Sequence, residues 1–284
     1  MEKRIIFAQM NNSNSILLID PEFDPTTATN CNLLVKLGAD SFSYAIINKL
    51  SKKIIAVYDE QECEDVMLKL TERFKNDTYL TLPYQEVKIA IPTPSSIALP
   101  NVFFDDYSLK SHAKLFPNLN DKLYTQIQSH FDFTSIFSVS KNLDSILQQY
   151  LPAAKKLQEN TGLITIAEQL TETSLLLDFS VGVFNVLYVH NQQVVFQQCY
   201  EIEQVEEFNY YLLLIINQLE IDTKKTAVFL SGIVHESDEK HSCLLKYFKD
   251  VEFLNVDSDL DQQILEDMPL HYYSNLLALN KCVL

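Results

Sequence analysis

Short apolar segments separated by turn residues dominate two stretches of the chain. The first stretch contains three such segments, at residues 32–37, 42–47 and 54–58. Apolar runs of this length, with short polar turns between them, predict a three-stranded antiparallel meander. Residues 59–76 follow, with apolar side chains at helical spacing (Val66, Leu70 and Phe74) and charged residues between them, which predicts an amphipathic helix.

The same order of elements returns in the second half of the chain. Three predicted strands, at residues 174–179, 183–189 and 194–200, precede a predicted helix at 203–219. Aligning Leu34 with Leu176 places the two copies 142 residues apart, which is half of the chain. The first copy is expected to continue with a strand at 87–91, helices at 105–116 and 121–130, and a strand at 134–139. The second is expected to continue with a strand at 226–230, a helix at 240–249 and a strand at 251–256.

This order predicts an α/β protein with two tandem β-β-β-α-β-α lobes and mixed sheets. The expected domains are a first lobe at residues 31–150 and a second lobe at residues 151–284. Residues 1–30, which are rich in Asn, Pro and Thr, are expected to form an irregular lead-in segment.

The chain has only four glycines: Gly38, Gly162, Gly182 and Gly232. A glycine-rich phosphate loop needs two or three glycines within about six residues, because its backbone turns tightly and approaches the anion closely. The spacing of the four therefore excludes dinucleotide-binding, Walker-type and kinase-type loops. It also excludes the nucleophile elbow of the α/β-hydrolases.

Acidic residues outnumber basic residues by 38 to 22, and the formal net charge is −16. Residues 143–284 carry 21 acidic and 8 basic side chains, so most of this charge lies in the second half. An acidic chain lacks the cations that neutralise phosphates, which disfavours nucleic acid and anionic membranes as partners. The charge is typical of a well-solvated surface; the alternative is a basic protein partner for the second half.

The five cysteines are scattered, and no pair of them has the spacing of a metal site or a redox motif. This pattern predicts reduced thiols in a cytoplasmic protein. We expect no signal peptide, since the chain turns polar by Gln9, and no membrane span, since the apolar runs are far shorter than ~20 residues.

Four segments carry a resemblance to a known fold. They are LVKLGADSFSY at 34–44, LLLDFSVG at 175–182, VFLSG at 228–232 and MPLHYY at 268–273. With the tandem lobes, they make the chain similar to the actin-like ATPase (ribonuclease H-like) superfamily. In detail the chain resembles an uncharacterised bacterial family with that fold. More distantly it looks like the actin-like proteins of type IV pilus and type II secretion assemblies.

The resemblance implies where a nucleotide site would lie. In the superfamily, the nucleotide sits between the lobes, the first β–β turn of each lobe clamps phosphate and metal, and a Gly-Gly turn of the second lobe supports the adenosine. The residues of this chain that match those turns are Gly38, Asp40, Asp178, Gly182, Ser231 and Gly232.

All three turns depart from the superfamily pattern. Lys36 stands where the first phosphate turn usually has Asp, and an ammonium repels Mg²⁺. Ser180 replaces the glycine of the second phosphate turn, which adds a Cβ where backbone approaches phosphate. Ile233 replaces the second glycine of the adenosine turn. We therefore interpret these turns as a vestigial nucleotide cleft, with no bound metal or cofactor.

The predicted function is a non-catalytic actin-like binding or scaffolding protein with a protein partner. A helix laid in the disused cleft is the favoured mode of binding, and a strand added to a sheet edge is the other mode. The rival hypothesis is an ATP-binding protein or ATPase in which Asp40 or Asp178 organises Mg²⁺. A plain adaptor with a closed cleft, and a homodimer, also remain open.

Overall fold

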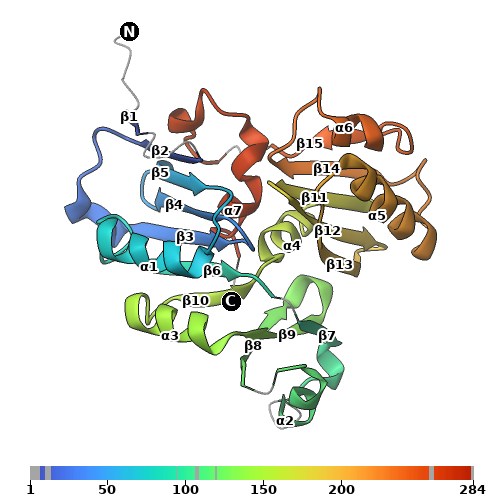
Figure 1. Cartoon of the computed structure of the whole chain (residues 1–284), viewed down its shortest axis with the longest axis horizontal. Helices are drawn as coiled ribbons and strands as arrows, with labels where there is room; N and C mark the ends of the chain where they lie inside the picture. Colours follow the sequence, from blue (N-terminus) through green and yellow to red (C-terminus); the bar gives the residue numbers. More distant parts are fainter. Residues whose placement is uncertain are drawn as a thin grey trace. The chain divides into compact units, whose positions relative to one another are not determined.

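The computed structural model describes residues 7–9, 14–93, 95–105, 109–118, 120–255 and 259–282. The chain forms two compact units, which we call unit 1 and unit 2. Unit 1 contains Met1–Thr161, Asp259–Glu266 and Leu279–Leu284; unit 2 contains Gly162–Ser258 and Asp267–Ala278. Both are α/β units built on a mixed sheet (Figure 1).

The main sheet of unit 1 has seven strands in the order β1-β2-β5-β4-β3-β6-β10. Their bounds are β1 (Phe7–Gln9), β2 (Ser15–Ile19), β3 (Cys31–Leu37), β4 (Phe42–Asn48), β5 (Lys53–Glu60), β6 (Glu86–Ile91) and β10 (Lys155–Gln158). The predicted antiparallel meander is confirmed by the pairing of β3 with β4 and of β4 with β5. Strands β6 and β10 extend the sheet in parallel from β3.

Two helices of unit 1 cover one face of this sheet, α1 (Val66–Asn76) and α3 (Lys141–Tyr150). Asp65 caps α1, since its side chain accepts a hydrogen bond from the amide of Leu68, and Ser140 caps α3 in the same way. Alternate residues of β3 pack against the apolar faces of both helices. The buried set includes Leu33, Val35, Leu37, Leu70, Phe74, Leu143 and Leu147.

Unit 1 also has a small antiparallel sheet in the order β7-β9-β8, formed by β7 (Ser96–Pro100), β9 (Phe133–Val139) and β8 (Lys122–Gln128). The predicted helix at 121–130 is therefore wrong. Residues 122–128 form β8, which pairs along its whole length with the fully buried strand β9, and such pairing overrides a weak local preference. Ser129–Phe131 form a 3₁₀ turn. The predicted helix at 105–116 reduces to the single turn α2 (Leu109–His112) and a 3₁₀ turn at Ala113–Leu115; residues 106–108 lie outside the described residues.

The sheet of unit 2 has five strands in the order β13-β12-β11-β14-β15. Their bounds are β11 (Ser174–Ser180), β12 (Val183–His190), β13 (Gln193–Glu201), β14 (Ala227–Gly232) and β15 (Val251–Phe253). Helices α5 (Val205–Gln218) and α6 (Glu239–Leu244) bury apolar side chains on one face, against Leu177, Phe179 and Phe184 among others. The remaining helices are α4 (Thr161–Ala167) and α7 (Ser274–Ala278), of which α7 packs on β14.

The register of the two sheets confirms the internal repeat. Lys36 of β3 pairs with Ser43 of β4, and Asp178 of β11 pairs with Asn185 of β12, so both strands of each first hairpin are offset by 142 residues. In both units the first strand also pairs in parallel with the fourth strand of the repeat, β6 or β14. Lys36 and Asp178 thus occupy the same position in two equivalent sheets.

The units divide differently from the expected lobes. The described residues of the predicted lead-in at 1–30 are not all irregular, because β1 and β2 add two strands to the edge of the unit 1 sheet through pairing of β2 with β5; residues 1–6 and 10–13 lie outside the described residues. Residues 155–158 form β10 in unit 1, and the C-terminal Leu279–Leu284 also returns to unit 1. Strands β2 and β10 join the sheet through pairing with β5 and β6, far away in the sequence, and a local apolar pattern does not indicate such pairing.

Candidate functional site

The first candidate turn, residues 38–41, joins β3 to β4 in unit 1 and contains Gly38 and Asp40. The amide of Gly38 donates to the carbonyl oxygen of Ser41 at 2.8 Å, which closes the hairpin. The carbonyl oxygen of Asp40 accepts from the amide of Cys63 at 2.7 Å. The backbone of this turn therefore holds β3, β4 and the segment before α1 together.

Lys36 lies just before this turn, on the sheet face opposite α1. Ser43 and Asp59 are its neighbours across the next two strands, so a half-buried ammonium and a half-buried carboxyl share this face. Burial raises the pKa of Asp59 to about 6, while a hydrogen bond from Gln61 and the charge of Lys36 act in the opposite direction. The acid on this face belongs to the third strand of the meander, and the first strand contributes a cation.

Asp178 is the only carboxylate among the strand residues of β11, and its side chain is 1% exposed. Its Oδ1 accepts from the Oγ of Ser231 on β14 at 2.7 Å, and its Oδ2 accepts from the Nδ2 of Asn275 on α7 at 2.7 Å. The structure thus brings together two predicted site residues, Asp178 and Ser231. Asn275 is a third member that sequence reasoning missed, since it lies 97 residues further along the chain.

Gly232 ends β14 and approaches the backbone of β11 closely. Its φ is +77°, and a Cβ there would lie 2.0 Å from the carbonyl oxygen of Phe179. The next amide, of Ile233, donates to that same oxygen at 2.8 Å. Only glycine fits this position without strain, and its role in the fold is to join β14 to β11.

Gly182 is exposed in the two-residue turn between β11 and β12, with φ +71°. It lies beside an open pocket of about 860 Å³ in unit 2. The pocket is formed by this turn, the segment from the end of β13 into α5, and the start of α6. Its lining residues are Val181, Gly182, Ile202, Glu203, Gln204, Val205, Glu206, Asp238, Glu239 and Lys240. Of the six predicted site residues, Gly182 alone lines this pocket.

The charge of this pocket is mainly negative. Four carboxylates line it, and the single ammonium is that of Lys240, whose Nζ lies 5.3 Å from the ring centre of Phe179. Burial lowers the pKa of Lys240, and the charge of Asp238 opposes that shift. Such a lining favours a cationic ligand over a polyphosphate.

The start of α5 faces this pocket, and the negative charge of Glu207, a residue of the same helix, opposes the partial positive charge of that helix end. The carboxylate of Glu207 accepts from the amides of Glu203 at 2.6 Å and Gln204 at 3.4 Å. Glu206 adds a second negative charge to the first turn. Two negative charges of the first turn therefore oppose the partial positive charge of this helix end, and one of them also binds the two amides just before the helix.

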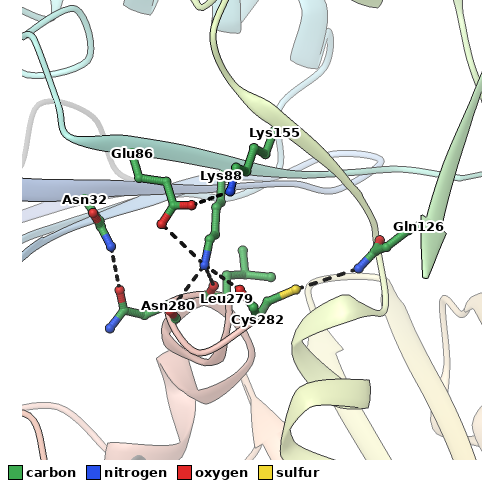
Figure 2. A network of polar contacts seen from close by, with 8 residues as sticks. All are labelled: Asn32, Glu86, Lys88, Gln126, Lys155, Leu279, Asn280 and Cys282. Atoms are coloured by element: carbon green, nitrogen blue, oxygen red, sulfur yellow. Dashed lines mark hydrogen bonds and ion pairs between the residues drawn. The ribbon is translucent and has the colours of Figure 1, made fainter. Parts of the chain in front are cut away.

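A second polar cluster, in unit 1, surrounds the buried Lys88 of β6 (Figure 2). Its side chain is 3% exposed, and its Nζ donates to the carbonyl oxygens of Leu279 at 3.1 Å, Asn280 at 3.2 Å and Cys282 at 2.7 Å. Glu86 lies 3.6 Å from the same ammonium. Burial lowers the pKa of Lys88 and the charge of Glu86 raises it.

Two further contacts tie the same C-terminal residues to unit 1. The Nδ2 of Asn32 donates to the Oδ1 of Asn280 at 3.0 Å, and the Nε2 of Gln126 lies 3.8 Å from the sulfur of Cys282. No sequence signal pointed to this cluster, because Lys88 follows the alternation of an ordinary strand and its partners lie about 190 residues away. Its chemistry is that of a structural clamp on backbone carbonyls.

Two absences concern the described part of the chain. There, no group of three or more His, Cys, Asp or Glu side chains is placed to hold a metal ion. Among the same residues, no helix combines the length and the apolar character needed to cross a bilayer.

Comparison with solved structures identifies the fold. A protein from Bacteroides thetaiotaomicron VPI-5482 with an actin-like ATPase fold and unknown function is 18% identical, with a TM-score of 0.74 over 92% of this chain and 99% of that one. A chain of the PilM–PilN type IV pilus biogenesis complex is 10% identical, with a TM-score of 0.63 over 88% of this chain and 98% of that one. The chain has the actin-like ATPase fold, as the sequence predicted.

A weaker likeness links the chain to the cytoplasmic domain of EpsL, from the type II secretion system of Vibrio cholerae. This domain is 11% identical, with a TM-score of 0.48 over 86% of this chain and 98% of that one. No curated protein is detectably similar in sequence. The model of one family, described as "Protein of unknown function (DUF3822)", matches residues 20–251. Because this match spans most of the sequence, the chain belongs to the DUF3822 family.

Proposed function

We propose that this protein is a non-catalytic, cytoplasmic actin-like scaffold that binds a protein partner and does not turn over Mg·ATP. The observation that carries the proposal is the pair of equivalent positions Lys36 and Asp178. The first is a cation, and the second is a buried carboxylate whose two oxygens accept from Ser231 and Asn275. Neither side chain is set up as a Mg²⁺ ligand, because that ion prefers carboxylates that are open to water and phosphate.

The pocket of unit 2 supports the same conclusion. It lies beside the second candidate phosphate turn, yet four of its lining side chains are carboxylates. A triphosphate placed there would meet like charge, and the carboxylate of Glu207 already accepts from the amides of Glu203 and Gln204, just before α5. The likeness to a chain of the PilM–PilN complex is the reason to propose a protein as the ligand.

Affinity capture of the tagged chain from the cells that make it tests this function. The capture is done in parallel with Mg·ATP and with EDTA, and ATP hydrolysis is measured on the same preparation. A scaffold retains the same partner in the same proportion under both conditions and shows no hydrolysis. Nucleotide-dependent capture, or hydrolysis that Asp178→Asn abolishes, would favour the ATPase hypothesis. Absence of any partner under both conditions would refute the scaffold.

A further inference from the structure

We propose that the open edge of β13 binds an extended, basic segment of the partner by β-strand addition. In this arrangement a Lys or Arg side chain of that segment enters the acidic pocket beside Gly182. The inference rests on the proposed function and names the chemistry of the partner. It uses the sheet edge of unit 2 as the binding surface.

The position of β13 in the sheet supplies the first argument. In the described residues β13 pairs with β12 and with no other strand, so it forms one edge of the five-stranded sheet. Alternate residues of an edge strand direct their N–H and C=O groups away from the sheet. A register shift leaves Val195 as an extra residue, and Phe196–Glu201 then pair regularly with β12. Phe196–Glu201 thus form a regular stretch of edge, along which the backbone of a partner strand of about the same length can pair.

The composition of β13 supplies the second argument, because natural proteins protect exposed edges with Lys, Pro, β-bulges or short strands. The sequence QVVFQQCYE contains none of Lys, Arg, Pro and Gly, and its bulge at Val195 lies before the regular run Phe196–Glu201. Other described edge strands are protected. Strands β1 and β15 have three residues each, β10 contains two lysines, β8 begins with Lys122, and β7 ends in Pro100.

The pocket supplies the charge complementarity. Strand β13 ends at Glu201, and the next residues, Ile202 and Glu203, already line the pocket. Glu203, Glu206 and Glu239 are exposed carboxylates there, while Val181, Ile202 and Val205 provide apolar contacts for the stem of a long cationic side chain. A Lys or Arg of the added segment that lies beyond the end of β13 would therefore place its charged end near these carboxylates and its stem against these apolar side chains.

The direction of the added strand follows from the sheet. All pairs within this meander are antiparallel, and antiparallel pairing is slightly more stable per residue than parallel pairing. An antiparallel partner strand begins beside Glu201 and the pocket. We therefore expect Lys or Arg directly before an extended run of β-branched or aromatic residues.

A phage-displayed library of random peptides about 12 residues long is the probe, selected against the full chain. Three variants separate the contributions. Val195→Lys/Gln198→Lys charges the edge, Glu203→Gln/Glu206→Gln removes charge from the pocket, and Glu172→Gln/Glu252→Gln removes the same charge from exposed sites elsewhere in unit 2. Thermal unfolding establishes that each variant is folded before binding is compared.

We expect the selected peptides to carry Lys or Arg before an extended run. Their affinity should fall at least about tenfold for the edge and pocket variants and stay unchanged for the control. Hydrogen exchange on the wild-type chain should slow at residues 196–201 when the peptide binds, which keeps the proposal testable if a variant fails to fold. Enriched peptides without a basic residue, unchanged exchange in β13, or no enrichment at all would overturn it. A cellular partner captured equally by the wild type and the edge variant would refute the edge while leaving the scaffold function intact.

Discussion

Asp178 and Lys36 occupy the same position in the two copies of a duplicated fold, but their side chains make different contacts. In unit 2 the position holds a buried carboxylate that joins β11 to Ser231 of β14 and to Asn275 of α7. In unit 1 it holds a half-buried ammonium on the same face as Asp59. The carboxylate thus joins three elements of unit 2, whereas in unit 1 burial raises the pKa of Asp59 and the charge of the Lys36 ammonium opposes that rise.

Removing the Asn275 side chain should destabilise the protein, because the buried carboxylate of Asp178 then loses one of its hydrogen-bond donors. In Asn275→Ala, Oδ2 loses the donor that lies 2.7 Å away, and we expect the free energy of unfolding to fall by about 1–3 kcal/mol. Urea denaturation measures this change. Asn217→Ala, on an exposed part of α5, is the matched control and should change stability by less than about 0.5 kcal/mol. Equal effects of the two substitutions would show that Asp178 does not depend on Asn275.

Asp59 should make stability depend on pH. Its pKa of about 6 in the folded protein lies above the ordinary value of 3.8, so the folded state holds the proton more strongly than the unfolded state does. The resulting stabilisation is complete below about pH 4 and is lost as the pH rises through 6. Asp59→Asn lacks this titration.

Thermal unfolding of the wild type and Asp59→Asn at about pH 4 and about pH 7.5 tests this claim. The difference in Tm should shift in favour of Asp59→Asn as the pH rises. Asp250→Asn, which removes an exposed carboxyl from unit 2, is the control for loss of a negative charge. A difference between Asp59→Asn and the wild type that is the same at both pH values would contradict the raised pKa.

Among the elements, β6 anchors the C-terminal segment, a role that its sequence pattern does not predict. Its Lys88 holds three backbone carbonyls of residues 279–282 and so anchors the C-terminal segment to unit 1. Because the contacts are to backbone, they depend on the ammonium and not on the side chains of the segment. The cluster is therefore a structural anchor and separate from the pocket of unit 2.

Lys88→Met should release this anchor. We expect hydrogen exchange at residues 279–282 to accelerate and the free energy of unfolding to fall by about 2 kcal/mol, because hydrogen bonds to a charged group are lost. Lys155→Met is the control: this half-exposed lysine bonds Glu86 in the same cluster but does not bond the C-terminal carbonyls. If exchange in the segment were as slow in Lys88→Met as in the wild type, the anchor would have to lie elsewhere.

The elements also show what the sequence could predict. The two meanders were predictable because their strands are short, apolar and separated by turns, and the offset of 142 residues then placed Lys36 and Asp178 in equivalent positions. Strand β8 was mistaken for a helix, since its residues alternate only weakly and its stability comes from pairing with β9. Strands β2 and β10 are short, and they are stabilised by pairing with strands far away in the sequence.

The candidate site was predictable only in part, for the same reason. Asp178 and Ser231 were singled out through the turns that follow their strands. Asn275, Lys88 and the lining of the pocket involve partners far apart in the chain, and spacing along a sequence carries no information about such pairs. The role of Gly232 in joining β14 to β11 likewise follows from backbone approach, which the sequence alone does not display.

The whole molecule combines an actin-like ATPase fold with a strongly negative charge. Its net charge is −16, and the pocket beside Gly182 is lined by four carboxylates. Under the proposed function, this charge and the hydrogen-bonded state of Asp178 act against binding of Mg·ATP. The same negative charge favours a basic partner, because opposite charges accelerate the encounter of two proteins. We therefore expect partner binding to weaken as the salt concentration rises, while Mg·ATP leaves it unchanged.

The most direct test is titration calorimetry of the purified full chain with Mg·ATP at concentrations up to the millimolar range. Wild type, Asp178→Asn and the exposed control Asp250→Asn are measured side by side. The proposed function predicts no saturable heat for any of the three. A micromolar Kd for the wild type that is lost in Asp178→Asn and kept in Asp250→Asn would contradict it and establish an ATP site at Asp178.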